Sequence, residues 1–202
     1  LFESTAAENI GAMILGVVAY VATGNVAWIL FPLVVRGFGM FASMIGIMIV
    51  KAKENENAMN ALNRGYYVAI GLSIVGLAIT VYFMLDSWWL FAAGLVGIAA
   101  SIAIIFVTQY YTESRYKPVK DIAEASKTGP ATNIVAGVAV GFETTFATAM
   151  VIGSALILSF VFGELSGVKG GGAFGTAVAT MGMLMTCPYV LSMDTFGPIT
   201  DN

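Results

Sequence analysis

The chain has 202 residues, of which 58% are hydrophobic and only 10% are charged, and its net charge is −3. Soluble domains carry about 25% charged residues, so this composition is typical of a chain that lies in a bilayer. Cys187 is the only cysteine and histidine is absent, which excludes disulfide frameworks, cysteine or histidine metal sites and serine–histidine triads within the chain. The basic residues form no cluster that would bind nucleic acid.

Charged and turn-forming residues divide the sequence into six apolar runs. A helix of about 20 residues crosses a hydrocarbon core of about 30 Å, and in lipid only a helix satisfies the backbone polar groups of a single segment. We therefore predict an all-α, polytopic transmembrane helix bundle, in which residues 1–202 form a single transmembrane region. The six spans are expected near 5–24, 26–50, 65–85, 88–108, 131–162 and 173–191, and a seventh helix is expected to start near Leu191.

The opening residues LFESTAAENIGAMILG contain neither a basic region nor a cleavage site, so they are not a signal peptide. Position 1 is leucine rather than methionine. We expect the chain to be an internal piece of a larger membrane protein.

The basic residues predict the orientation of the spans. Seven of the nine lie in two loops, 51–64 and 109–129, which fall on one side of the membrane if six spans alternate. The opposite turns contribute only Lys169. The positive-inside rule places both basic loops in the cytoplasm, together with the two ends of the chain. Trp88 and Trp89 are expected in the aromatic belt at the outer edge.

Charged residues inside the spans are candidates for function, because a charge in lipid is costly. Glu3 and Glu8 enter the first span, but their five-residue separation places them about 140° apart on a helix. Glu143 is either buried against a hydroxyl or basic partner or part of a polar path. Arg36 either extends its charge to the interface or pairs with an acidic residue in the bundle.

The chain ends in DTFGPITDN, residues 194–202, which carries Asp194, Asp201 and Asn202. The two aspartates are seven residues apart, so on a continuous helix they point roughly the same way, about 10 Å apart along the axis. Carboxylate and amide oxygens on one helix face suit Mg²⁺. The ordinary alternative is a helix N-terminus, where aspartate is favoured by capping and by the helix dipole.

Two glycine patterns have ordinary interpretations. GGGAFG, residues 170–175, matches the GxGxxG pattern of dinucleotide sites, but it lies in a turn between two apolar spans and follows no strand. Gly137 and Gly141 form a GxxxG pair, which allows close helix packing but also occurs by chance in a glycine-rich chain.

Three separated stretches together resemble the membrane-integral pyrophosphatases, which are ion pumps that hydrolyse inorganic pyrophosphate. They are LFES at residues 1–4, YYTESRYKPVKDIAEASKTGPATNIVAGVAVGFETT at residues 110–145 and DTFGPITDN. The resemblance implies a homodimer with about sixteen helices in each subunit. It implies that this chain covers helices six to eleven and the start of the twelfth, and that it is inactive alone.

The resemblance also implies roles for single residues. Asp194 would be catalytic and would bind Mg²⁺, Asn202 and Asp201 would be further magnesium contacts, and Glu3 would belong to the ion gate. The implied protein lies in a lipid bilayer, in a prokaryotic cell membrane, and takes pyrophosphate and either H⁺ or Na⁺. A requirement for K⁺ is possible for such a pump and is left open by these residues. The alternative function is that of a secondary transporter or channel without hydrolytic activity.

Overall fold

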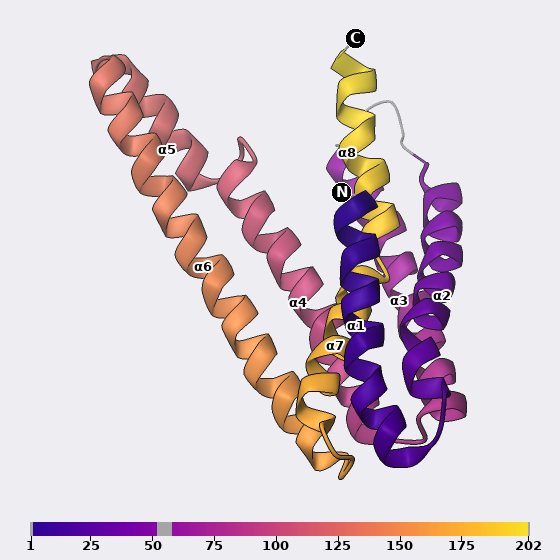
Figure 1. The fold of residues 1–202 in the computed structure, drawn as a ribbon. Coiled ribbons are helices and arrows are strands. Elements are labelled where there is room, and N and C mark those ends of the chain that lie inside the picture. Colours follow the sequence, from indigo (N-terminus) through magenta and orange to yellow (C-terminus); the bar gives the residue numbers. More distant parts are fainter. Residues whose placement is uncertain (1, 52–57, 202) are drawn as a thin grey trace. The chain divides into compact units, whose positions relative to one another are not determined.

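The computed structural model describes residues 2–51 and 58–201, with the side chains of residues 2, 196–198, 200 and 201 left out. Over this part of the chain the structure is helical and contains no strand (Figure 1). The elements are α1 (Phe2–Thr23), α2 (Ala27–Ile49), α3 (Ala58–Met84), α4 (Trp88–Thr112), α5 (Lys117–Ala125), the 3₁₀ helix η1 (Ser126–Thr128), α6 (Pro130–Leu165), α7 (Gly171–Leu184) and α8 (Cys187–Asp201).

The predicted all-α fold with six membrane spans is confirmed. Among the described residues, six helical segments are long and apolar enough to cross a membrane. Three boundaries differ from the prediction. Helix α3 begins at Ala58, inside the expected 51–64 loop, and the expected 109–129 loop folds as α5 and η1. The sixth span runs over Gly171–Thr195 and is interrupted after Leu184, so the helix expected from Leu191 starts at Cys187.

Two compact units make up the chain. The larger unit contains Leu1–Ala99 and Leu156–Asn202, and therefore holds α1, α2, α3, α7, α8 and parts of α4 and α6. The smaller unit contains Ala100–Ala155. Every site residue described below, apart from Glu143, belongs to the larger unit.

Helix α2 is the centre of the larger unit and contacts α1, α3, α7 and α8. Its buried side chains recur every three or four residues, which places them on one helix face. We call this face the α2 seam; it consists of Trp28, Pro32, Val35, Gly39, Ala42 and Gly46. Small residues dominate its second half, so neighbouring backbones approach it closely. A Cβ atom added at Gly46 would lie only 2.9 Å from the carbonyl oxygen of Gly65 in α3.

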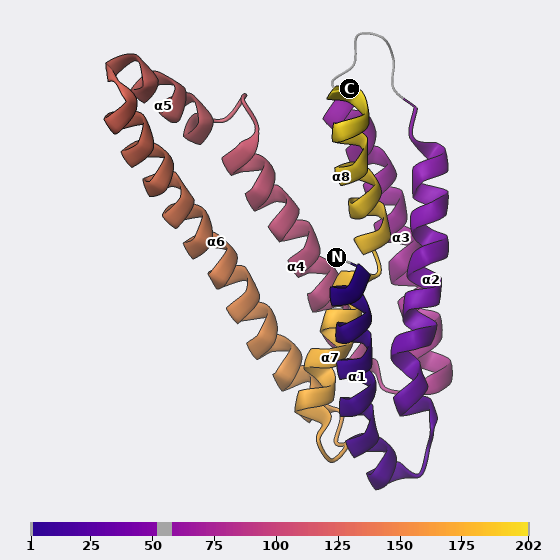
Figure 2. The ribbon, with the colours of Figure 1, turned by 45° about the horizontal axis from the view of Figure 1, so that its top comes forward.

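In both views of the larger unit, the end of α2 and the end of α8 point the same way, and the start of α1 lies beside the first turns of α8 (Figures 1 and 2). A guanidinium nitrogen of Arg64 donates a hydrogen bond to the carbonyl oxygen of Lys51 at 2.8 Å, which joins the start of α3 to the residues after α2. The helices that carry Glu3 and Asp194, α1 and α8, therefore lie near each other although they come from opposite ends of the chain. Spans that alternate in direction produce this arrangement.

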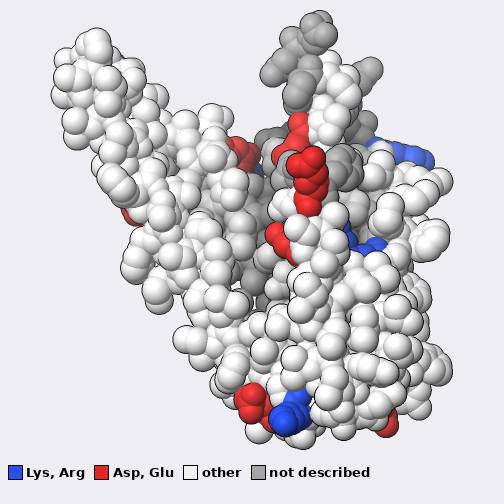
Figure 3. All heavy atoms as spheres, viewed as in Figure 1, with Lys and Arg blue, Asp and Glu red and all other residues white. Residues whose placement is uncertain are grey.

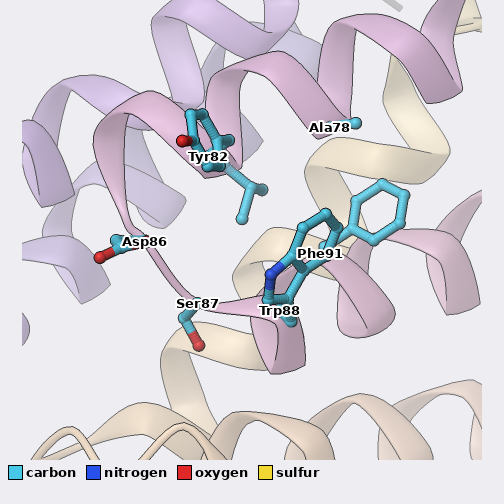
Figure 4. Close-up of a pocket in the computed structure, with 7 residues that line it drawn as sticks. Ala78, Tyr82, Asp86, Ser87, Trp88 and Phe91 are labelled. Carbon is cyan, nitrogen blue, oxygen red and sulfur yellow. The ribbon is translucent and has the colours of Figure 1, made fainter.

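The turn between α3 and α4 lies at the other end of these helices. Asp86 takes the left-handed conformation, with φ of 47°, and ends α3. A small pocket beside the turn is lined by Tyr82, Trp88 and Phe91 among others (Figure 4). The rings of Trp88 and Phe91 meet edge to face at 5.7 Å, while Trp88 remains 71% exposed. An amphipathic ring exposed at a helix start is what the predicted aromatic belt requires.

Glycines also hold α7 against α4 in the larger unit. A Cβ atom added at Gly97 would collide with the carbonyl oxygen of Ala179, and one added at Gly182 would collide with that of Gly94. Backbone-to-backbone packing of this kind is common between membrane helices, where small residues allow close contact.

This packing leads to a prediction about Gly97. We expect Gly97→Ala to lower the free energy of unfolding of the complete protein by about 1–3 kcal/mol, because the added methyl group overpacks a rigid backbone contact. The matched control is Gly71→Ala on α3, where an added Cβ has no atom within 4 Å among the described residues. The measurement is thermal unfolding in detergent. Equal effects of the two substitutions would contradict the α4–α7 contact.

The smaller unit folds around the connection from α4 to α6. Lys127 pairs with Glu124 at 2.8 Å, and the guanidinium of Arg115 lies 4.8 Å from the ring centre of Tyr116. Added Cβ atoms at Gly137 and Gly141 would have no neighbour within 4 Å in the described chain. The GxxxG pair therefore makes no close helix contact in this structure.

Candidate functional site

Acidic side chains gather at one end of the larger unit, over the start of α1 and over α8 (Figure 3). Glu3 and Glu8 come from α1 and Asp194 comes from α8, and all three side chains are exposed. The hydroxyl of Ser4 donates a hydrogen bond of 3.5 Å to the Glu8 carboxylate. The sequence-predicted residues Glu3 and Asp194 thus belong to the same acidic end of the molecule.

Arg36 lies in the middle of α2. The sequence suggested either that its charge extends to the interface or that it pairs with an acidic residue, and its hydrogen-bond partner in the structure is a backbone carbonyl. Its Nη1 atom donates a hydrogen bond of 2.8 Å to the carbonyl oxygen of Leu184, the last residue of α7. A cation at a helix C-terminus is favoured by the helix dipole. The side chain is part-buried, so its charge is held inside the bundle and binds backbone rather than a carboxylate among the described residues.

Cys187, the first residue of α8, links the acidic end to Arg36. Arg36, Glu8 and Asp194 all lie near enough to the Cys187 thiol for their charges to act on it. Sequence reasoning had used Cys187 only to exclude disulfides and metal sites. Its place at this junction depends on long-range packing, and no sequence signal could have found it.

Helix α8 carries Asp194, and an interruption in the sixth span sets where α8 begins. Pro188 is the second residue of α8 and has no N–H, so it cannot donate to the carbonyl of Leu184 four residues earlier. The N–H of Tyr189 donates to Thr186 at 3.1 Å instead of continuing the regular pattern. The Tyr189 hydroxyl anchors α8 to α3 through a 2.6 Å hydrogen bond to the carbonyl of Leu62.

The other predicted residues are placed less completely. The side chain of Asp201 and the whole of Asn202 lie outside the described residues, so their expected contact with magnesium stays a prediction. Glu143 is exposed on α6 and lies near the Tyr111 hydroxyl in the smaller unit. The two alternatives for Glu143, burial against a partner and a place in a polar path, both stay predictions.

The donor chemistry of the acidic end suits magnesium, since Mg²⁺ prefers carboxylate oxygens and water. However, no three of the described His, Cys, Asp and Glu side chains lie together as a metal-binding group. Glu3, Glu8 and Asp194 alone are therefore insufficient for a complete site. Further ligands would have to come from Asp201, Asn202 or segments beyond these residues.

The glycine-rich turn before α7 serves packing. Gly170 has φ of +76° and precedes the first residue of α7, and no strand leads into it. The backbone N–H of Gly172 donates a 3.0 Å hydrogen bond to the Glu164 carboxylate. This geometry supports a close turn between α6 and α7 rather than a dinucleotide site.

Comparison with known proteins identifies the family. A family model described as inorganic H⁺ pyrophosphatase matches residues 1–202. The whole chain is 53% identical to a K⁺-insensitive pyrophosphate-energized proton pump 2 of Moorella thermoacetica and covers 30% of that protein. It is 46% identical to a K⁺-insensitive pyrophosphate-energized proton pump of Caldanaerobacter subterraneus, again covering 30%. It is 44% identical to the pyrophosphate-energized membrane proton pump 3 of Arabidopsis thaliana, covering 28%.

The chain thus spans less than a third of the length of these curated relatives, while the family match extends along its whole length. The match agrees with the six apolar helices and with the three stretches that resemble the membrane-integral pyrophosphatases. The chain belongs to the inorganic H⁺ pyrophosphatase family.

Proposed function

We propose that the complete protein hydrolyses magnesium-bound pyrophosphate and couples this reaction to proton transport out of the cytoplasm. The observation that carries the proposal is the match to the family over the whole chain, with relatives named as proton pumps. Those names favour H⁺ over Na⁺ as the transported ion. The Moorella and Caldanaerobacter relatives are also named as K⁺-insensitive, so we propose that hydrolysis here needs no K⁺.

In this proposal the acidic end of the larger unit contributes to the hydrolytic site. Asp194, Asp201 and Asn202 would hold Mg²⁺, which neutralises the charge of the phosphate oxygens when it is bound. The Asp194 carboxylate would also orient the attacking water and accept its proton. Positioning and charge neutralisation are the main demands of phosphoryl transfer, so exposed carboxylates on a helix anchored by Tyr189 suit the reaction.

Glu3 is proposed as the ion-gate residue. It lies in the first turn of α1, and acidic side chains gather over the start of α1 and over α8, the helix that carries Asp194. A carboxylate at the mouth of a membrane span is costly to enclose unless it is protonated or paired. Its protonation state can therefore change as a proton passes, which is the property that coupling requires.

The experiment that tests the function measures both activities on one sample. The complete protein is placed in sealed inverted vesicles, and pyrophosphate hydrolysis and lumen acidification are recorded together, with and without Na⁺ and K⁺. We expect both activities to be dependent on Mg²⁺ and independent of Na⁺ and K⁺. A secondary transporter or channel would show no hydrolysis, and acidification that required Na⁺ would overturn the proposed ion.

The proposed orientation places residues 51–64 and 109–129 in the cytoplasm, because seven of nine basic residues lie there. We expect a cysteine at position 126 (Ser126→Cys) to be unreactive toward an impermeant maleimide added outside intact cells. A cysteine at position 169 (Lys169→Cys) should react. Cys187 and any other native cysteine of the complete protein are replaced in both variants so that only the introduced thiol reports. Labelling of position 126 from outside would show that the orientation is reversed.

We also propose that the complete protein forms a homodimer and lies in a prokaryotic cell membrane.

A further inference from the structure

The interruption between α7 and α8 leaves two backbone carbonyls without the donors that a continuous helix would supply. Pro188 has no N–H to offer Leu184, and the N–H of Tyr189 bonds to Thr186 rather than to Met185. Unpaired carbonyls inside a membrane protein are strongly unfavourable, because no water reaches them. Each must therefore be satisfied by another donor.

Two side chains of α2 supply those donors. Arg36 donates to the Leu184 carbonyl at 2.8 Å, and the hydroxyl of Ser43 lies 3.4 Å from the Met185 carbonyl. The two residues are seven apart on one helix, so they lie on the same face, with Gly39 between them. A Cβ atom added at Gly39 would lie 2.7 Å from both the Cα and the carbonyl oxygen of Met185. Because Gly39 has no side chain, the backbone of Met185 at the interruption can pack directly against the backbone of α2.

We infer that Arg36 is a positioning residue: with Ser43 it forms a carbonyl clamp that fixes the start of α8 and thereby the place of Asp194. Leu184 precedes Asp194 by ten residues. Arg36 hydrogen-bonds to Leu184 before the interruption, and its charge lies near the Cys187 thiol after it. Loss of the guanidinium would free the end of α7 from α2 and let α8 change direction. The consequence for hydrolysis rests on the function proposed above, whereas the clamp itself does not.

Pro188 offers a sharp test, because alanine at this position restores the missing N–H. In Pro188→Ala the new N–H can donate to the Leu184 carbonyl, so the donor from Arg36 is no longer needed. The clamp therefore predicts that Pro188→Ala compensates for Arg36→Met, which keeps the length of the side chain but removes its donors. A role of Arg36 as a general positive charge predicts no such compensation.

The experiment is a double-mutant cycle in the complete protein, in membranes, with Cys187 as the only cysteine. The first readout is the rate at which a permeant maleimide labels Cys187. We expect Arg36→Met to raise this rate at least tenfold, and addition of Pro188→Ala to reverse most of the increase. Arg36→Met and the double variant both lack the guanidinium and differ only at position 188. A difference between their labelling rates therefore reports the effect of the restored N–H on the interruption. Additive effects of the two substitutions would overturn the clamp.

The second readout is steady-state hydrolysis of magnesium pyrophosphate. We expect Arg36→Met to lower kcat at least tenfold with a smaller change in KM, Arg36→Lys to recover most of kcat, and the double variant to exceed Arg36→Met. Lys169→Met, which removes an exposed positive charge from the same unit, is the matched control and should leave kcat unchanged. No loss of kcat in Arg36→Met, in an active parent, would overturn the positioning role.

The two readouts separate failure of the clamp from failure of the proposed function. If the parent protein does not hydrolyse pyrophosphate, the proposed function fails, and the labelling cycle still tests the clamp. If Arg36→Met does not accumulate in membranes, the amount of protein becomes the readout. Recovery of that amount in the double variant supports the clamp, and no recovery overturns it.

Discussion

Asp194→Ala in the complete protein is expected to lower the rate of pyrophosphate hydrolysis by at least about a thousandfold, which corresponds to about 4 kcal/mol in the barrier. The physical reason is that Asp194 is the described carboxylate on α8, at the acidic end where magnesium and the attacking water are proposed to bind. Its loss removes both a metal ligand and a proton acceptor. Hydrolysis is measured as phosphate release over a range of Mg²⁺ concentrations, with membrane insertion checked on the same preparation.

The control for this substitution is Asp121→Ala, which removes an exposed carboxylate from α5 in the smaller unit. That variant should hydrolyse pyrophosphate at the parent rate, because an exposed surface charge contributes little. Parent-like hydrolysis and Mg²⁺ dependence in Asp194→Ala would mean that this residue only stabilises its helix.

Glu3→Gln is expected to lower proton pumping more than tenfold, which corresponds to about 1.4 kcal/mol or more in the barrier. Glutamine keeps the size of the side chain but cannot release or take up a proton. Transport should therefore fall at least as much as hydrolysis. Proton uptake and pyrophosphate hydrolysis are measured together in sealed vesicles, and their ratio is compared with that of the parent.

The ordinary alternative is that Glu3 only favours the N-terminus of α1, an effect worth about 0.3–1 kcal/mol of stability and irrelevant to transport. Glu124→Gln, on exposed α5, is the matched control for removal of a carboxylate. Unchanged uptake per pyrophosphate at an unchanged rate of hydrolysis would exclude Glu3 as the gate. Glu8, five residues further along α1, would then be tested in the same way.

The apolar runs predicted the middle of every span correctly, because the bilayer imposes a length and a composition that are visible in the sequence. The ends were predicted less well. Asn60, Asn63 and Arg64 are polar, so the sequence predicts a loop where α3 begins at Ala58. These residues belong to the first turns of the helix. At the end of a membrane span, a polar residue can lie in a helix or in a loop, so polarity does not predict the secondary structure there.

The interruption of the sixth span shows a different limit. Pro188 was visible in the sequence, but apolar residues continue on both sides of it, and hydropathy alone reads them as one helix. The partner of Arg36 is a backbone carbonyl 148 residues away. Backbone carbonyls have no sequence signature, so sequence reasoning searched for an acidic partner and missed the one that is present.

The candidate site was found mainly through resemblance. The motifs LFES and DTFGPITDN point to Glu3 and Asp194, and the structure puts these residues on α1 and α8, over which acidic side chains gather. Their seven-residue spacing predicts that the side chains of Asp194 and Asp201 point the same way on a continuous helix. The side chain of Asp201 lies outside the described residues, so this stays a prediction. For Glu143, the apolar run left burial and a polar path open. Few residues of α6 are covered by other described parts of the chain, so both alternatives stay predictions.

The hydrogen bond from Arg36 to Leu184 also constrains the order in which this sequence can change over time. While proline occupies position 188, a substitution at Arg36 removes the only described donor to that carbonyl. Replacement of Pro188 by a residue with an N–H would make later changes at Arg36 tolerable. Natural sequences that lack the arginine are therefore expected to lack the proline too, whereas sequences that keep the arginine without the proline can persist as intermediates.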